Sequence, residues 1–97
     1  MIRVSVMYPK TEGASFDMDY YRTKHFEIVD RTMKPARWEI HAGINGPYEV
    51  VAHMYYDSMD AMQAGMAEAA EAGADVPNFT TITSEVQIAQ VVEQSDS

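Results

Sequence analysis

Apolar and polar side chains alternate at the start of the chain. Apolar residues occupy every second position from Ile2 to Tyr8, and Arg3 and Ser5 lie between them. A period of two predicts a β-strand with one apolar face. The loop that follows leads to Asp17, whose carboxylate is suited to cap the amide groups of a helix.

The next segment has the spacing of an amphipathic helix, predicted to run from Asp17 to about Met33 and to end before Pro35. At about 100° per residue, one broad face collects the apolar side chains. These are Met18, Tyr21, His25, Phe26, Ile28, Val29 and Met33. The opposite face is predicted to carry Tyr20, Lys24, Glu27 and Arg31. His25 therefore lies near the middle of the apolar face.

Two further alternating segments are predicted to form a hairpin. The first runs over 37–44 and the second over 48–56, and Asn45-Gly46-Pro47 lies between them. Asparagine and glycine tolerate positive φ and proline fixes φ, as a tight turn requires. These segments are the second and third strands.

Asp57 and Ser58 are predicted to open a second helix, which ends at Ala72-Gly73-Ala74. Its inward stripe is expected to consist of Met59, Met62, Met66, Ala69 and Ala70. A loop over 75–79 then leads to a last strand from Ile82 to Val92, and residues 93–97 are expected to form a loose polar tail.

The order β-α-β-β-α-β predicts an α+β fold of the ferredoxin-like type, with a four-stranded antiparallel sheet and two helices on one face. We expect a single domain over residues 1–92. The face without helices is expected to carry Arg3, Ser5, Met7, Arg37, Glu39, His41, Val51, His53, Tyr55, Glu85 and Gln87. Periodicity alone leaves open whether water or a second subunit covers that face.

Composition narrows the function classes. The 97 residues are 46% hydrophobic and 23% charged, as in a globular domain, and a domain this short gains stability from a partner subunit. Seven Lys and Arg against fifteen Asp and Glu give a net charge of −8, which argues against a nucleic-acid partner. The absence of cysteine excludes disulfides, thiolate metal sites and a cysteine nucleophile. Arg3 and Ser5 interrupt the first apolar run, so we expect no signal peptide, no membrane span and a cytoplasmic location.

A set of spaced residues in the first quarter of the chain resembles the EthD family, within the dimeric α/β-barrel superfamily. The family pattern YP…G…FD..YY…H is matched by Tyr8-Pro9, Gly13, Phe16-Asp17, Tyr20-Tyr21 and His25. The later stretch Pro77-Asn78-Phe79-Thr80 is also similar to the family. One departure is Glu27, which stands where the family commonly has proline.

The resemblance implies that two sheets pack face to face, so that a homodimer forms through the open sheet face. It also implies a ligand cleft between sheet and helices. The family's namesake is linked to bacterial breakdown of ethyl tert-butyl ether, and relatives in the superfamily include cofactor-free oxygenases of aromatic polyketides and haem-binding proteins. By analogy we expect a small hydrophobic ligand and a role in oxidative degradation.

His25 is the candidate acid–base residue, because imidazole exchanges protons near neutral pH. Tyr21, one helical turn earlier, is a second candidate that would orient it. A substrate pocket is expected to be lined by Tyr8, Trp38, Met54, Met62, Met66 and Phe79. All of these residue types also occur as ordinary core. His41 and His53 are predicted to point away from the helices and from His25, so we expect no metal site and no cofactor.

Three functions are compatible with these patterns. The first is a cofactor-free enzyme, or a catalytic accessory, that uses His25 on a hydrophobic oxygen-bearing compound. The second is a non-catalytic carrier or a haem-binding protein with His25 as the ligand. The third is an interaction module whose cleft is filled by its own side chains.

Overall fold

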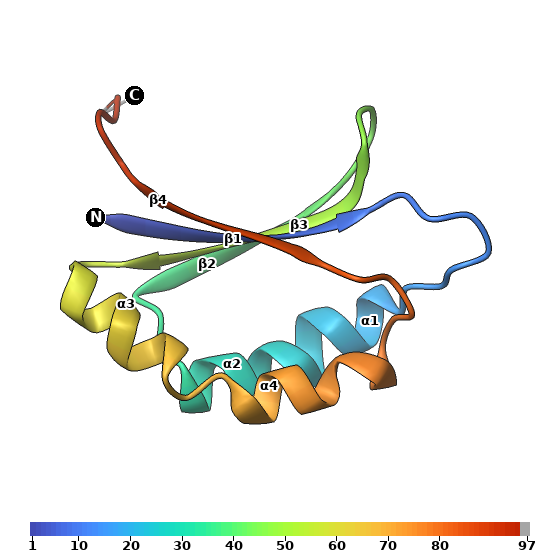
Figure 1. Ribbon diagram of the computed structural model, residues 1–97, viewed down its shortest axis with the longest axis horizontal. Coiled ribbons are helices and arrows are strands. Elements are labelled where there is room, and N and C mark those ends of the chain that lie inside the picture. The colour runs from blue at the N-terminus through green and yellow to red at the C-terminus, as the bar shows by residue number, and fades with distance from the viewer. Residues whose placement is uncertain (96–97) are drawn as a thin grey trace.

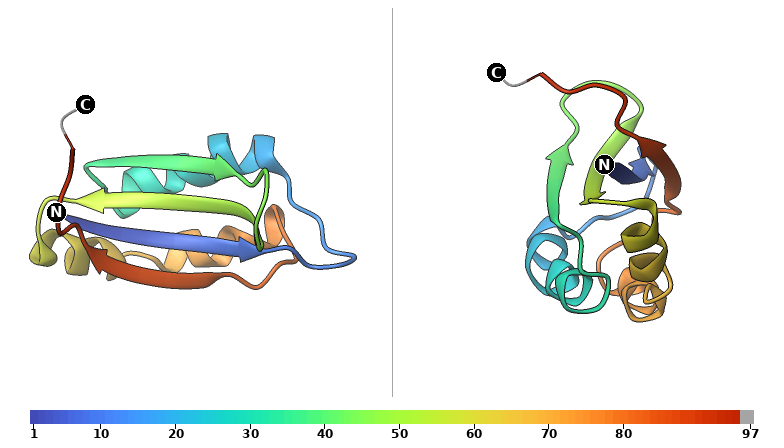
Figure 2. Two further views of the ribbon diagram at one scale, coloured as in Figure 1. Left: turned by 90° about the horizontal axis from the view of Figure 1, so that it is seen from above. Right: turned by 90° about the vertical axis from the view of Figure 1, so that its left-hand side faces the viewer.

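An antiparallel sheet of four strands is covered by helices on one face and open on the other (Figures 1 and 2). The computed structural model describes residues 1–95. Its strands are β1 (Ile2–Pro9), β2 (Arg37–Ala42), β3 (Tyr48–Tyr56) and β4 (Glu85–Gln90), in the order β2-β3-β1-β4. The predicted α+β, ferredoxin-like arrangement is confirmed.

Six short helical segments form the second layer. The first three follow one another directly: α1 (Met18–Tyr20), the π-helical turn η1 (Tyr21–His25) and α2 (Phe26–Thr32). The others are α3 (Met59–Met66), α4 (Ala70–Asp75) and the 3-10 turn η2 (Val76–Asn78). Asp17 caps α1 as predicted, since its carboxylate accepts a hydrogen bond from the Tyr20 amide at 3.0 Å. In the described residues 1–95 no helix is long and apolar enough to cross a bilayer.

The strand register decides which side chains face the helices. Val4 pairs with Met54 on β3 and with Ile88 on β4, and these three face the helical layer. The next residue, Ser5, pairs with His53 and Gln87 on the open face. Val4 is fully buried, and it belongs to a core that Tyr21, Phe26 and Val29 complete from the helical side.

The open face carries the residues predicted for it, and their polar groups pair with one another. The Ser5 hydroxyl lies 2.7 Å from Nδ1 of His53, and Nε2 of His41 lies 3.2 Å from a Glu39 oxygen. The guanidinium of Arg37 lies 3.8 Å from the ring centroid of Tyr55. A polar face that is already internally paired can be covered without leaving isolated charges.

Several predicted boundaries are wrong. The second predicted helix is broken at 67–69. The amides of Glu68 and Ala69 donate to carbonyls three residues earlier, which tightens the end of α3, and α4 then begins as a separate helix. Met59 and Ala70, both predicted inside, are exposed. The second strand ends at Ala42, and Ile44 is exposed in the following turn.

The last strand is also shorter than predicted. It spans Glu85–Gln90 and leaves out Ile82, which is buried in an irregular segment. The Ile82 amide there donates to the Thr80 hydroxyl at 3.0 Å, a side-chain partner that replaces a sheet partner. Residues 91 and 92, predicted to end this strand, lie outside it, and residues 93–95 of the predicted tail carry no helix or strand. The last two residues of the predicted tail lie outside the described residues.

Candidate functional site

The turn that carries His25 is wider than an ordinary helical turn. The Phe26 amide donates to the carbonyl of Tyr21, five residues earlier, which is the hydrogen bond of a π-helix. In the wider turn, residues four apart lie almost directly above one another along the helix axis. The rings of Tyr21 and His25 stack there, with centroids 5.2 Å apart and an angle of 11° between their planes. Phe79 packs on the His25 ring at 4.6 Å. The imidazole is thereby held in one orientation.

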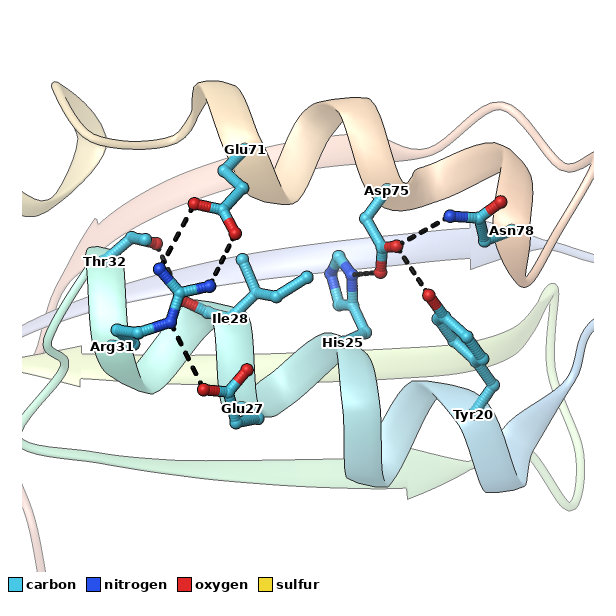
Figure 3. A network of polar contacts seen from close by, with 9 residues as sticks. All are labelled: Tyr20, His25, Glu27, Ile28, Arg31, Thr32, Glu71, Asp75 and Asn78. Carbon is cyan, nitrogen blue, oxygen red and sulfur yellow. Dashed lines mark hydrogen bonds and ion pairs between the residues drawn. The ribbon is translucent and has the colours of Figure 1, made fainter.

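An acidic partner meets His25 from the opposite helix (Figure 3). Nδ1 of His25 lies 3.0 Å from Oδ2 of Asp75 at the end of α4, and the two residues are only 6% and 8% exposed. The other oxygen of Asp75, Oδ1, accepts hydrogen bonds from the Tyr20 hydroxyl at 2.7 Å and the Asn78 amide at 2.9 Å. Three donors therefore converge on one buried carboxylate.

These contacts determine the protonation state of the pair. Burial raises the pKa of Asp75, but the hydrogen bonds from Tyr20, Asn78 and His25 together lower that pKa below its usual value. Burial lowers the pKa of His25 below 6.5, more than the neighbouring Asp75 raises it. At neutral pH the carboxylate is ionised and the imidazole is neutral. Its proton then sits on Nδ1, facing Asp75, and Nε2 carries the lone pair.

A cavity of about 190 Å³ opens beside this imidazole. It lies between the helices and the helix-facing side of β1, β3 and β4. Its lining includes Tyr8, Tyr21, His25, Met54 and Met66, together with Ser84 just before β4 and Val86 on β4. In residues 1–95, no side-chain nitrogen or oxygen is both sealed from solvent and without a partner. Asp75 contacts Nδ1 of His25 and leaves Nε2 without a hydrogen bond in the described residues. Nε2 is therefore not sealed and reaches open space.

The residues predicted as substrate contacts lie in three different places. Tyr8, Met54 and Met66 line the cavity, together with the predicted acid–base residues Tyr21 and His25. Met62 and Phe79 are buried in the core and are not among the lining residues. Trp38 lies at a separate shallow depression outside Phe26, where its indole nitrogen donates to Asp30 at 2.8 Å.

Sequence reasoning missed Asp75 as the partner of His25. We placed Asp75 in a loop, whereas it ends a helix that lies against η1. Tyr20 was predicted on the outer face of its helix, yet its hydroxyl reaches Asp75 because α4 packs on that side. One signal in the sequence could have pointed to this partner. Asp75 and Asn78 are three residues apart, just before Phe79, a spacing that makes them neighbours if the segment is helical.

The two tyrosines of the lining are neutral phenols. Burial raises the pKa of Tyr21 far above its usual range, and it also raises the pKa of Tyr8. They offer hydroxyl groups to a ligand and no charge. Elsewhere in residues 1–95, no group of three or more His, Asp or Glu side chains is arranged to hold a metal ion. The rings of His41 and His53 meet edge to face on the open face, with centroids 5.0 Å apart, away from His25.

The lowered pKa of His25 predicts that acid destabilises the fold. Below pH 6.5, His25 binds a proton in the unfolded chain but stays neutral to lower pH in the folded protein. The free energy of unfolding therefore decreases as the pH falls. His53 adds to this effect, since burial, Arg3 and His41 lower its pKa. Urea unfolding at about pH 7 and about pH 5 measures the loss. His25→Gln should reduce the difference between the two pH values, and an unchanged difference would contradict this account.

Comparisons with known proteins support the EthD resemblance. The chain is similar to an EthD-like protein of Ralstonia eutropha JMP134, with 32% identity and a TM-score of 0.86, over 98% of this chain and 95% of the other. An ethyl tert-butyl ether D family protein of Bacillus halodurans C-125 has 17% identity and a TM-score of 0.74, with coverage of 95% and 99%.

More distant structures share the fold. A variant of SnoaB, a cofactor-independent oxygenase from Streptomyces nogalater, has 11% identity and a TM-score of 0.67, over 99% of this chain and 96% of that one. No protein-family model and no curated protein matches the chain.

Proposed function

The chain belongs to the EthD family, and from this premise we propose that it is a homodimeric small-molecule-binding protein that takes a proton from a hydrophobic, oxygen-bearing compound through His25. The observation that carries the proposal is the position of His25 between Asp75 and the cavity. A neutral imidazole whose Nδ1 proton is held by a carboxylate presents its Nε2 lone pair as a general base. The protein would act in oxidative degradation without a bound cofactor, either as the catalyst or as an accessory protein.

The size of the cavity helps to choose between a small ligand, haem and a cleft filled by the protein's own side chains. Pockets for drug-sized ligands have volumes of about 300–1,000 Å³. The volume beside His25 is about 190 Å³, which favours a compound much smaller than haem. An open volume also argues against an interaction module whose cleft is filled by its own side chains.

A chromogenic probe tests the proposed base. Nitrobenzisoxazole reacts when a base removes its ring C–H proton; the ring N–O bond then breaks, and a nitrile and a coloured phenolate form. We expect the protein to accelerate this reaction and His25→Gln to lower the rate about a hundredfold or more. The rate should fall as the pH falls through the pKa of His25, which lies below 6.5.

His53→Gln is the matched control, because His53 lies on the open face and does not line the cavity. Its rate should equal that of the unaltered protein. A folded His25→Gln variant that retained the full rate would refute the assignment of His25 as the base.

The proposed homodimer uses the open sheet face. Family membership supports it. Met7 and Val51 lie side by side on the open face and are only partly buried in the single chain. A second copy would cover these groups.

Val51→Glu should therefore dissociate the dimer. Val51 pairs with Met7 on one side and His41 on the other, so a glutamate there would be desolvated in the interface. We expect the dissociation constant to rise about a hundredfold or more, measured by sedimentation velocity over a concentration series. Ile44→Glu is the control, because Ile44 is 99% exposed in the turn between β2 and β3. Val51→Glu with unchanged dissociation would contradict the proposed interface.

A further inference from the structure

The cavity beside His25 has no charged side chain among the residues that line it in the described chain. Its polar groups are the hydroxyls of Tyr8, Tyr21 and Ser84 and the imidazole of His25. The nearest ionised group is the carboxylate of Asp75, directly behind the imidazole at 3.0 Å. A carboxylate or phosphate would lose its hydration here and meet no cation, which is costly. The lining therefore favours an uncharged ligand.

The polar atom that His25 offers to the cavity is an acceptor. Asp75 holds the Nδ1 proton, so Nε2 needs a hydrogen-bond donor when a ligand displaces water from it. A ligand hydroxyl supplies that donor. A hydrocarbon or an ether of the same shape leaves Nε2 unpaired, which weakens binding about ten- to a hundredfold.

The volume and the apolar lining indicate a single ring. An apolar cavity of about 150 Å³ holds one benzene molecule. At about 190 Å³ this cavity holds one ring with a short substituent. The thioethers of Met33, Met54 and Met66 all line it, and sulfur makes favourable contacts with aromatic ring edges.

We infer that the ligand is a small, uncharged phenol or cyclic enol whose hydroxyl donates to Nε2 of His25. This inference rests on the proposed function and names its substrate class. In the proton transfer, the ligand O–H bond breaks and an N–H bond forms at Nε2. The resulting phenolate or enolate is then paired with an imidazolium that Asp75 stabilises from behind. An ether has no such proton to give.

Three ligands of nearly the same shape test the inference: para-cresol, para-xylene and para-toluate. Their affinities are measured by calorimetry on the unaltered protein, so the comparison does not depend on the folding of a variant. We expect para-cresol to bind about ten- to a hundredfold more tightly than para-xylene, and para-toluate to bind more weakly than both. In His25→Leu the preference for para-cresol should disappear, whereas His53→Gln should keep it.

The outcomes distinguish this inference from the proposed function. Equal binding of para-cresol and para-xylene, or tight binding of para-toluate, would overturn the ligand class even if nitrobenzisoxazole turnover still required His25. Loss of that His25-dependent turnover would instead remove the proposed base. A preference for para-cresol that persists in His25→Leu would also overturn the inference, because another group would then be the acceptor.

Discussion

Asp75→Asn is expected to remove nearly all of the base activity of His25, although it replaces only one atom of the side chain. Tyr20 and Asn78 both donate to Oδ1 of Asp75, so the oxygen of the new carboxamide stays at that position. Its NH₂ group then occupies the Oδ2 position and donates toward Nδ1 of His25. Nδ1 must accept, the imidazole proton moves to Nε2, and the cavity loses its lone pair.

Two measurements check this expectation. Nitrobenzisoxazole turnover should fall by about a hundredfold or more. Long-range ¹H–¹⁵N correlation spectra should show the His25 proton on Nδ1 in the unaltered protein and on Nε2 in Asp75→Asn. Asp30→Asn is the control, because it removes an exposed carboxylate that contacts Trp38 and not the His25 pair. Full turnover by Asp75→Asn with the proton still on Nδ1 would show that Asp75 does not set the tautomer.

Gly65→Ala is expected to produce a large loss of stability. A Cβ at this position of α3 would lie 2.5 Å from the Met33 carbonyl oxygen and 2.6 Å from the Tyr56 hydroxyl. Those two groups are hydrogen-bonded to each other at 3.0 Å in the core, so neither moves freely. The helix must shift away from the sheet, at a cost of about 1–3 kcal/mol for overpacking. In a domain of this size that lowers the Tm by at least about 4 °C.

Gly73→Ala is the matched control in the neighbouring helix. A Cβ on Gly73 of α4 would meet no atom within 4 Å. Alanine is the better helix former, so this variant should gain about 0.5–1 kcal/mol. Thermal unfolding followed by circular dichroism compares the two variants. Equal shifts in the same direction would refute the close approach of α3 to Tyr56.

Local periodicity was sufficient to predict the layers of this fold. The alternation from Ile2 to Tyr8 and over 48–56 specified two strands and their inward faces, because successive strand side chains point to opposite sides. The helical spacing from Asp17 to Met33 likewise placed His25 on the apolar side. Both periods are properties of neighbouring residues, so the sequence displays them directly.

Breaks within elements could not be read in the same way. The pattern over 58–74 is compatible with one straight helix, yet the chain turns at 67–69, and Ala70 after the turn is exposed. The close contact of Gly65 with Met33 and Tyr56 places α3 in its own position on the sheet. That contact joins residues far apart in the sequence, and no local period encodes it.

By itself, the sequence determined that this is an α+β domain with a histidine on the inner face of its first helix, because those features follow from side-chain periodicity. Only the tertiary structure decided what that histidine can do. Its partner Asp75 lies fifty residues away on another helix, and Tyr20 reaches the same carboxylate from a face predicted to be outside. The tautomer and pKa of an imidazole depend on such through-space contacts and on burial, which exist only when the helices have packed.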